Sequence, residues 1–243
     1  MINSEKCQDG LQFLIDKYNV DADAKLNCND LMLNFDKSSF PLLPWRNERR
    51  FVELKNIVND GTLEGISVMR VCRIESVDSE LRSLIYRELD LCQWILGSKI
   101  SSIYMVENGE KAANIIAKME SGVVCTIEVA ATLPADSKII DKHEIISQRG
   151  IACDRVVDTQ VPQESIYLFT DEGEQAYLDV DFELFDYTVE EVALVRQGFA
   201  VIRDSKLRVE LAESAEYLMN MVDMAIQSAK SNKAMLASGG ANQ

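Results

Sequence analysis

The sequence is poor in the residues that most metal sites need. Its 243 residues include a single histidine, His143, and six cysteines scattered along the chain. No two cysteines have the Cys-x-x-Cys spacing, and a zinc site requires clustered ligands of this kind. Most of the cysteines lie in apolar runs, where a free thiol behaves as a small hydrophobic group. We therefore expect no metal site and no redox role for the cysteines.

Long apolar runs and an excess of positive charge are also missing. No stretch reaches the roughly 18 apolar residues of a transmembrane helix, so we expect no membrane span. Residues 1–6 lack the basic and then apolar layout of a signal peptide, which predicts a cytoplasmic protein. The formal net charge is −15, and such a chain offers no basic face for nucleic acid.

Acidic residues concentrate in the second half of the chain. Between Asp154 and Glu191 there are twelve acidic residues and one basic residue, Arg155. A solvated outer face that keeps the protein in solution is the simpler interpretation. A docking surface for a basic partner is the alternative.

Hydrophobic periodicity predicts three helices in the first hundred residues and two more near the C-terminus. The first three are expected over about residues 7–18, 47–59 and 78–97, the last capped by Asp78 or Ser79 and stopped by Gly97. Thr188 and Glu191 have the spacing of a capping box, so another helix should follow them. A closing helix is predicted through residues 211–229, and a frayed tail beyond Lys233.

The middle of the chain predicts strands. One is expected over residues 65–74, followed by a meander of antiparallel strands with glycine turns over residues 100–185. Within it, residues 179–184 alternate between acidic and apolar side chains. Residues 26–35 predict a short extended segment, and the prolines of residues 38–44 a turn-rich connection. The expected fold is α+β: a large, mostly antiparallel, open-faced sheet with helices packed on one face.

The segment Tyr86–Gly97 carries the most specific pattern. It resembles the helix that bears the catalytic histidine in the Gfo/Idh/MocA (glucose–fructose oxidoreductase, inositol dehydrogenase and MocA-like) family. That pattern is roughly Asp-x-x-x-His-(Asp/Glu)-x-Asp-x-x-x-Trp-Leu-x-Gly. Four positions are in register with it: Glu88, Asp90, Trp94 and Gly97. Arg87, however, stands at the histidine position, and Ser83 stands at that of the aspartate.

Weaker motifs extend the resemblance over about residues 45–235. The Arg50-Phe51 pair, with the helix and Gly65 that follow it, is similar to the segment leading into the family's C-terminal domain. Residues 116–129 are similar to two of that domain's sheet strands. The resemblance implies three parts, which are an N-terminal helix and connector (1–44), a C-terminal-like α+β domain (45–235) and a flexible tail (236–243).

Most of the family's nucleotide-binding domain has no counterpart here. The eleven glycines include no G-x-G-x-x-G turn to cradle a dinucleotide. No cofactor is therefore expected for the isolated chain, and NAD(P) only if a partner provides the Rossmann domain. Glu5-Lys6 resembles the family's Glu-Lys-Pro motif, with Cys7 in place of proline. On that resemblance Lys6 is a candidate remnant of a substrate-binding lysine.

The resemblance also implies that acid–base chemistry has been lost. Histidine suits proton transfer near neutral pH, whereas the guanidinium of Arg87 stays protonated at any working pH. Ser83 has no charge with which to orient a base. Glu88 and Asp90 are expected to be structural, paired with Arg82 or Arg87 or capping a loop. His143, in a predicted strand, is expected to be a half-buried surface residue.

A small basic patch precedes the second helix. Arg46, Arg49 and Arg50, beside Trp45, are candidates for binding an anionic sugar or phosphate. A solvated helix start or pairing with acidic residues is the alternative. The candidate ligand pocket comprises four residues: Arg49, Arg50, Glu88 and Asp90.

Three functions remain open. The first is a non-catalytic relative of the family that forms a homodimer through its open sheet face and binds a sugar-type molecule. The second is a truncated NAD(P)-dependent sugar or polyol oxidoreductase that works with a partner carrying the nucleotide-binding domain. The third is an acidic scaffolding protein for a basic partner.

Overall fold

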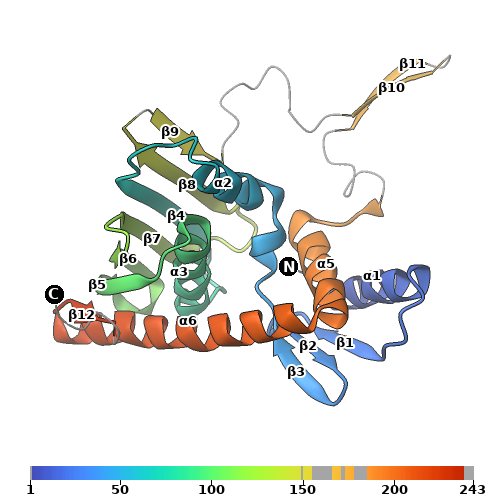
Figure 1. Cartoon of the computed structure of the whole chain (residues 1–243), viewed down its shortest axis with the longest axis horizontal. Coiled ribbons are helices and arrows are strands. Elements are labelled where there is room, and N and C mark those ends of the chain that lie inside the picture. Colours follow the sequence, from blue (N-terminus) through green and yellow to red (C-terminus); the bar gives the residue numbers. More distant parts are fainter. Residues whose placement is uncertain (1, 149, 155–165, 171–172, 178–184, 238–243) are drawn as a thin grey trace. The chain divides into compact units, whose positions relative to one another are not determined.

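The computed structural model describes residues 2–148, 150–154, 166–170, 173–177 and 185–237 (Figure 1). The chain divides into two compact units. The first comprises Met1–Glu48 and Val156–Glu213, and the second comprises Arg49–Arg155 and Ser214–Gln243. The division into residues 1–44, 45–235 and 236–243 stays a prediction.

The first unit combines helices with a small antiparallel sheet. Its helices are α1 (Ser4–Lys17), α5 (Val189–Arg203), the 3₁₀ helix η1 (Pro44–Asn47) and the start of α6 (Ser205–Ser231). Its sheet has the order β1 (Ala24–Asn27), β2 (Met32–Phe35) and β3 (Ser38–Pro41). Helix α5 packs closely on this sheet at Gly198, where an added Cβ would lie 3.0 Å from the Leu26 side chain. An added methyl group at this position would require the Leu26 side chain to move by a few tenths of an ångström.

Two expectations for this unit are corrected. Residues 26–35 form parts of two strands joined by a turn, not one extended segment. Residues 38–41 form strand β3, although the prolines there predicted a turn-rich connection. Pro41 is tolerated because β3 lies at the sheet edge, where a missing N–H breaks no ladder on the outer side.

Helix α5 begins at the predicted capping box. Thr188 Oγ1 accepts a hydrogen bond from the Glu191 N–H at 3.3 Å, and the Glu191 carboxylate accepts one from the Thr188 N–H at 3.0 Å. Glu191 Oε1 also accepts the Asn3 N–H, which ties the start of α1 to α5. The prediction is confirmed.

Replacing Thr188 with alanine should lower the free energy of unfolding by about 1 kcal/mol, because the Glu191 N–H loses its acceptor. Urea-induced unfolding followed by circular dichroism measures this change. Gln227→Ala, at an exposed position inside α6, is the matched control and should change the stability by less than about 0.5 kcal/mol. Equal stabilities of the two variants would contradict the prediction.

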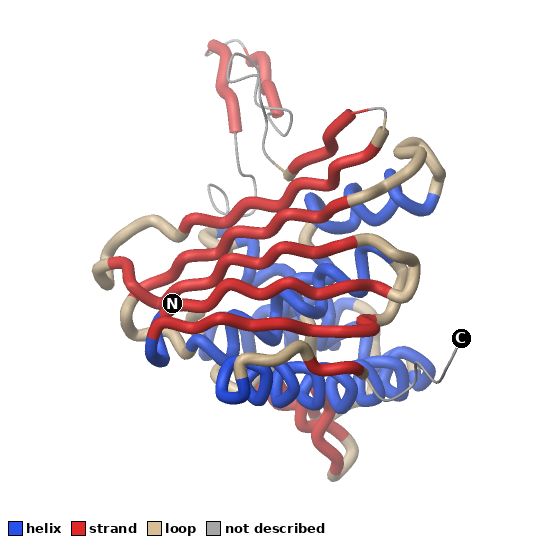
Figure 2. The backbone as a smooth tube through the Cα atoms, turned by 90° about the vertical axis from the view of Figure 1, so that its left-hand side faces the viewer, coloured by secondary structure: helices blue, strands red, loops and turns tan. Residues whose placement is uncertain are grey.

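The second unit is built on a seven-stranded sheet (Figure 2). The strands, in spatial order, are β12 (Met235–Leu236), β5 (Ile100–Asn108), β6 (Ala112–Met119), β7 (Val124–Leu133), β4 (Val68–Ser76), β8 (Ile140–Ser147) and β9 (Gly150–Cys153). The remaining regular elements are α2 (Arg49–Asn59), α3 (Leu81–Leu96) and the later part of α6, with a short 3₁₀ helix, η2 (Gly109–Lys111). Within the residue range of the first unit, a separate hairpin is formed by β10 (Ile166–Thr170) and β11 (Gly173–Tyr177).

The predicted meander is broken by one central strand. Strand β4 pairs with β7 in parallel and with β8 antiparallel, so it separates two strands that are consecutive in the chain. Parallel neighbours need a long connection, here supplied by α3, β5 and β6. Alternation within a strand does not tell which strand lies beside it, so this part of the meander prediction is wrong.

One face of the sheet carries helices and the other is open (Figure 2). Helix α3 buries its apolar stripe on the sheet, and the stripe includes Leu84, Ile85, Leu89, Cys92 and Ile95. Gly97 ends the helix in the left-handed conformation at φ 59°, as predicted. The α+β prediction with helices on one face is confirmed.

The ends of two segments differ from expectation. Helix α3 begins after Glu80, which makes no side-chain cap, so the prediction that Asp78 or Ser79 caps the helix is wrong. The hydroxyl of Ser79 donates instead to Glu75 at 2.7 Å. The frayed tail predicted beyond Lys233 is wrong for Met235 and Leu236, which pair with β5. Residues 179–184 lie outside the described residues. No helix in the described ranges is long and apolar enough to cross a membrane.

Candidate functional site

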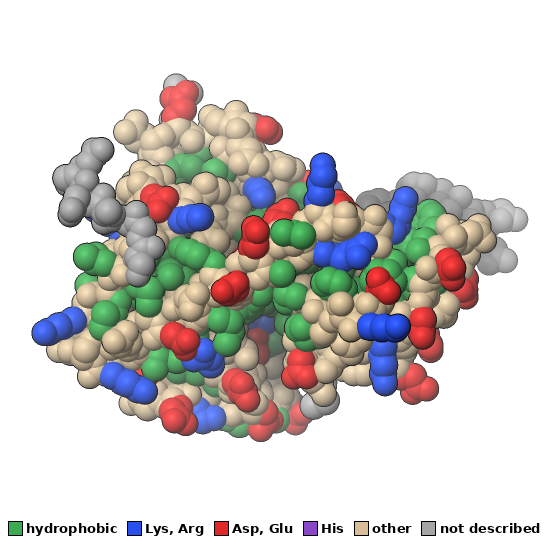
Figure 3. Space-filling model, turned by 60° about the horizontal axis from the view of Figure 1, so that its bottom comes forward, with side chains coloured by type: hydrophobic (Ala, Val, Ile, Leu, Met, Phe, Trp, Pro, Cys, Tyr) green, Lys and Arg blue, Asp and Glu red, His purple; other side chains and the backbone are tan. Residues whose placement is uncertain are grey.

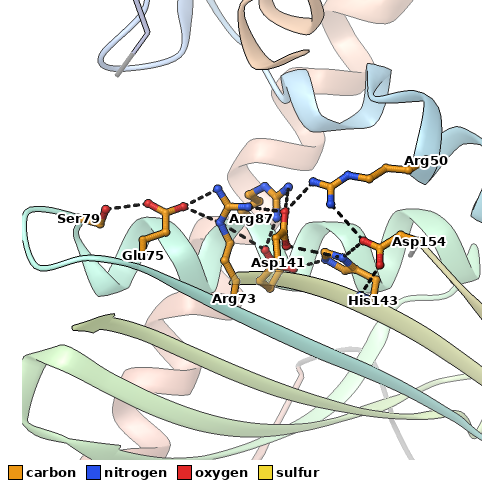
Figure 4. A network of polar contacts seen from close by, with 9 residues as sticks. Arg50, Arg73, Glu75, Ser79, Arg87, Asp141, His143 and Asp154 are labelled. Atoms are coloured by element: carbon orange, nitrogen blue, oxygen red, sulfur yellow. Dashed lines mark hydrogen bonds and ion pairs between the residues drawn. The ribbon is translucent and has the colours of Figure 1, made fainter. Parts of the chain in front are cut away.

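A cluster of charged side chains lies on the side of the sheet that faces α3 (Figure 4). We call it the charge network. It consists of Arg50 from α2, Arg73 and Glu75 from β4, Arg87 and Glu88 from α3, Asp141 and His143 from β8, and Asp154, which directly follows β9.

Strand alternation places these polar residues on the face that is otherwise apolar. On β4, Met69 and Val71 are buried, and Arg73 follows them two residues on, on the same face. On β8, Ile145 and His143 have the same relation. The inner face of the sheet thus changes from apolar to charged along the neighbouring strands β4 and β8.

His143 is the most enclosed member of the network. Its side chain is 0% exposed, and both ring nitrogens contact carboxylates. Nδ1 lies 2.7 Å from Asp154 Oδ2, and Nε2 lies 2.8 Å from Glu88 Oε2. The expectation of a half-buried surface residue is therefore wrong. The local pattern missed this position because the residues that cover it come from α2 and α3.

Asp141 is surrounded by guanidinium groups. Its Oδ2 atom lies 2.6 Å from Arg50, 2.7 Å from Arg73 and 3.3 Å from Arg87. Burial alone would raise the pKa of Asp141, but these three cations lower it overall. This carboxyl group is therefore ionised at any ordinary pH.

Glu88 has no exposed surface and pairs with both Arg87 and His143. Burial raises the pKa of Glu88, but the charge of Arg87 and then that of His143 outweigh it, so the pKa is lowered. The ion pair with Arg87 is one of the structural roles expected for Glu88. Because the charges are buried, each one depends on its partners.

The ring of Phe51 packs beneath the network. It is 0% exposed and meets the His143 ring edge-on, with 4.6 Å between the centroids. The guanidinium carbon of Arg50 lies 4.2 Å from the Phe51 centroid, and that of Arg87 lies 5.2 Å from it. The Phe51 ring thus carries two guanidinium groups over its face and forms a T-shaped contact with the histidine ring.

Glu88, Asp141 and His143 offer ligand atoms within 4.8 Å of one another, close enough for a metal ion. The surroundings do not suit one. Arg73 and Arg87 already neutralise these carboxylates, and a cation between them would meet guanidinium charge. The ring nitrogens of His143 are both directed at carboxylates and so point no lone pair at an ion. The residues present do not fit a metal site.

Comparison with known proteins adds the context of the fold. No family model matches the sequence, and a search of curated proteins found no match either. Among solved structures, the chain is similar to a probable dehydrogenase from Thermotoga maritima (TM-score 0.59, 14% identity) and to a putative myo-inositol dehydrogenase from Sinorhizobium meliloti 1021 (TM-score 0.58, 14% identity). Each match covers 81% of this chain and 64% of the other.

A third similar structure is scyllo-inositol dehydrogenase from Lactobacillus casei with bound NAD(H) and scyllo-inositol. Its TM-score is 0.55 at 13% identity, over 80% of this chain and 63% of the other. Over the matched residues, the chain shares the fold of part of these dehydrogenases, which are of the Gfo/Idh/MocA type. At this level of identity the likeness concerns the fold alone, and the chain spans less than two thirds of these proteins' length. The resemblance predicted from Tyr86–Gly97 is confirmed, and the shared fraction fits a part of such an enzyme that resembles its C-terminal domain.

Within this fold, the two positions that resemble the family's acid–base pair differ in environment. Arg87 is 7% exposed and is held by Glu88 and Asp141, whereas Ser83 is exposed on α3. The guanidinium of Arg87 is thus anchored by carboxylates from a helix and a strand. It does not substitute for a base.

The four residues of the candidate ligand pocket do not share one environment. Arg50 and Glu88 belong to the charge network, Asp90 is completely buried in α3, and Arg49 is exposed at the start of α2. In the part of the chain that the structure describes, no solvent-open pocket therefore reaches Glu88 or Asp90. Arg50 pairs with Asp141 and Asp154, which agrees with the alternative of pairing with acidic residues.

Arg46 and Lys6 belong to the first unit. Arg46 is buried, with its guanidinium 3.7 Å from Glu210. Lys6 Nζ lies 2.9 Å from Asp186 and 3.8 Å from Glu191, and it stacks over the Tyr187 ring. These contacts engage its ammonium group within the unit.

Sequence reasoning missed Arg73, Asp141 and Asp154. A usable signal was present for the first two. Arg73 falls on the same face of β4 as the apolar residue Val71. Asp141 precedes His143 by two residues, so these two share one face of β8. For Asp154, no local pattern indicates that it folds back onto His143.

Proposed function

We propose that this chain is a non-catalytic relative of the Gfo/Idh/MocA oxidoreductases that acts as a homodimer and retains a capacity to bind a sugar-type molecule. The observation that carries the proposal is the ion pairing of Arg87. At the position that resembles the catalytic histidine stands a permanent cation, and Glu88 and Asp141 hold it in place. No base is available there to take a proton from a hydroxyl group.

The open face of the sheet supports the dimer. Exposed apolar side chains lie across it, with exposed fractions of 54% for Val106, 46% for Ile116 and 60% for Ile151. Between them, Arg70 pairs with Glu144 at 2.7 Å, beside a shallow depression of about 200 Å³ around Cys72. A surface that combines apolar and paired charged groups suits an isologous contact between two copies.

The scaffolding alternative rests on the acidic stretch between Asp154 and Glu191, much of which lies outside the described residues. On the face in Figure 3, acidic and basic side chains are interspersed with hydrophobic ones. A scaffold for a basic partner would present a continuous acidic patch, and this one face does not carry one.

Sedimentation equilibrium tests the dimer. The wild-type chain should sediment as a dimer, and Ile116→Glu should shift it toward the monomer because a charge would be buried at the contact. Val209→Glu, which also replaces an exposed apolar residue but lies on α6, should remain a dimer. A monomeric wild-type protein would remove the oligomeric part of the proposal.

Titration with NAD(H) and NADP(H), followed by calorimetry, tests the non-catalytic part. We expect no micromolar binding of either cofactor, and weak binding of scyllo-inositol, the polyol in one of the similar structures. Micromolar binding of a dinucleotide by the purified chain would overturn the proposal.

The second candidate function rests on the shared length. The chain matches about 64% of the dehydrogenases to which it is similar, so a partner that supplies a nucleotide-binding domain would complete such an enzyme. Dinucleotide binding that requires both chains together would favour this candidate over the first.

A further inference from the structure

The contacts of His143 restrict its protonation state. Each ring nitrogen lies within hydrogen-bond distance of a carboxylate oxygen, one from Asp154 and one from Glu88. An ionised carboxylate accepts hydrogen bonds and cannot donate them. If both carboxyl groups are ionised, both ring nitrogens must carry hydrogen, and only the imidazolium form satisfies this condition.

Both carboxyl groups have the partners of ionised groups. Glu88 pairs with Arg87 in addition to His143. Asp154 Oδ1 accepts the backbone N–H of His143 at 3.0 Å, and its Oδ2 accepts Arg50 Nη1 at 3.1 Å. A proton on Asp154 would face one of these donors. The arrangement therefore fits a carboxylate on each side of the ring.

Charge counting over the network gives the same answer. Its carboxylates are Glu75, Glu88, Asp141 and Asp154, and its guanidinium groups are Arg50, Arg73 and Arg87. With neutral His143 the network carries one excess negative charge, and with imidazolium it is balanced. Unbalanced buried charge is strongly destabilising.

We propose that His143 is a buried imidazolium whose proton works as a pH-dependent lock between α3, β8, α2 and the residue that follows β9. Glu88 connects the ring to α3. Asp154 connects it to the end of β9 and, through Arg50, to α2. The charged groups facing the ring from the surrounding elements are Arg87 and Glu88 on α3, Asp141 on β8, Arg73 on β4, Arg50 on α2 and Asp154.

The pH window follows from the direction of the shift. Burial alone would lower the pKa of His143, but Glu88 and Asp154 raise it from 6.5 to about 8. A raised pKa means that the stabilisation is complete below pH 6.5 and is lost as the pH rises through 8. A shift of about 1.5 units corresponds to an approximately thirtyfold rise in the unfolding constant between the limits well below pH 6.5 and well above pH 8. Glu88 and Asp141 stay ionised throughout it, because their pKa values are lowered.

Nuclear magnetic resonance reads the protonation state directly, because His143 is the only histidine in the chain. In protein labelled with ¹⁵N-histidine, both ring nitrogens should show the imidazolium signature at pH 7 and titrate near pH 8. Asp154→Asn should lower the midpoint by about one unit, since one carboxylate partner is lost. Asp223→Asn, at an exposed ion pair with Arg82, should leave it unchanged. A neutral ring at pH 7, or equal midpoints in the two variants, would overturn the proposal.

Unfolding by urea supplies the second readout. The unfolding constant of the wild-type chain should rise about twentyfold between pH 6 and pH 8.5, and in Asp154→Asn the rise should be clearly smaller. Measurements should stop near this pH. Burial raises the pKa of Cys7 to about 12, so at higher pH this thiol ionises in the unfolded chain before it does in the folded one, which also lowers the stability. Identical pH profiles for wild type and Asp154→Asn would count against the lock.

Discussion

Replacing Glu88 with glutamine is expected to lower the free energy of unfolding by about 3–5 kcal/mol. Glutamine has nearly the same shape, so the change removes charge and leaves the volume almost intact. Arg87 and His143, which are 7% and 0% exposed, would then lose a carboxylate that no water can replace. Urea-induced unfolding of the full chain at pH 6.5, followed by circular dichroism, measures the loss.

The matched control is Asp223→Asn. Asp223 pairs with Arg82 at 2.7 Å, but the two side chains are 65% and 41% exposed. Solvent screens such a pair, so its removal should change the stability by less than about 1 kcal/mol. If Glu88→Gln were no less stable than this control, the buried pairs of Glu88 with Arg87 and His143 would contribute no more to stability than an exposed ion pair.

A double variant separates lost charge balance from lost packing. With His143 protonated, Glu88→Gln alone leaves one excess positive charge in the network, and Arg87→Met in the same chain removes it. The double variant should therefore be more stable than the sum of the two single changes predicts, by about 1 kcal/mol or more. Strict additivity would indicate that Arg87 and Glu88 act independently.

The individual helices were largely predictable, because their signals are local. The stripe of α3, its stop at Gly97 and the capping box of α5 each depend on residues within a few positions of one another. The pattern around Arg87 also indicated that this arginine stands at the position resembling the family's catalytic histidine. What Arg87 contacts was only partly readable, since Glu88 is its neighbour in sequence and Asp141 is not.

The charge network required knowledge of strand order. Asp141 meets Arg73 because β8 pairs with β4, and β4 reaches that position by pairing in parallel with β7. Asp141 and Arg73 are cross-strand partners, 68 residues apart in the chain. Periodicity assigns a residue to a face but not to a neighbour, which explains why His143 was expected at the surface and is in fact completely buried.

Among the uncharged residues that contact the charge network, Phe51 is the one whose truncation should lower the free energy of unfolding most. It is completely buried, and its ring touches His143 while lying close to Arg50 and Arg87. Phe51→Ala should lower the free energy of unfolding by about 3–5 kcal/mol, because it leaves a cavity beside buried charges. Phe51→Leu fills most of that volume but removes the aromatic face, so we expect an intermediate loss of about 1–2 kcal/mol.

Phe13→Ala provides the comparison, because Phe13 is 60% exposed on α1 and its loss should change the stability by less than about 0.5 kcal/mol. The histidine signal adds a readout that cavity formation alone does not predict. In Phe51→Leu the imidazolium should persist at pH 7, because Glu88 and Asp154 remain on either side of the ring. A neutral His143 in this variant would mean that the aromatic contact, rather than the two carboxylates, holds the proton in place.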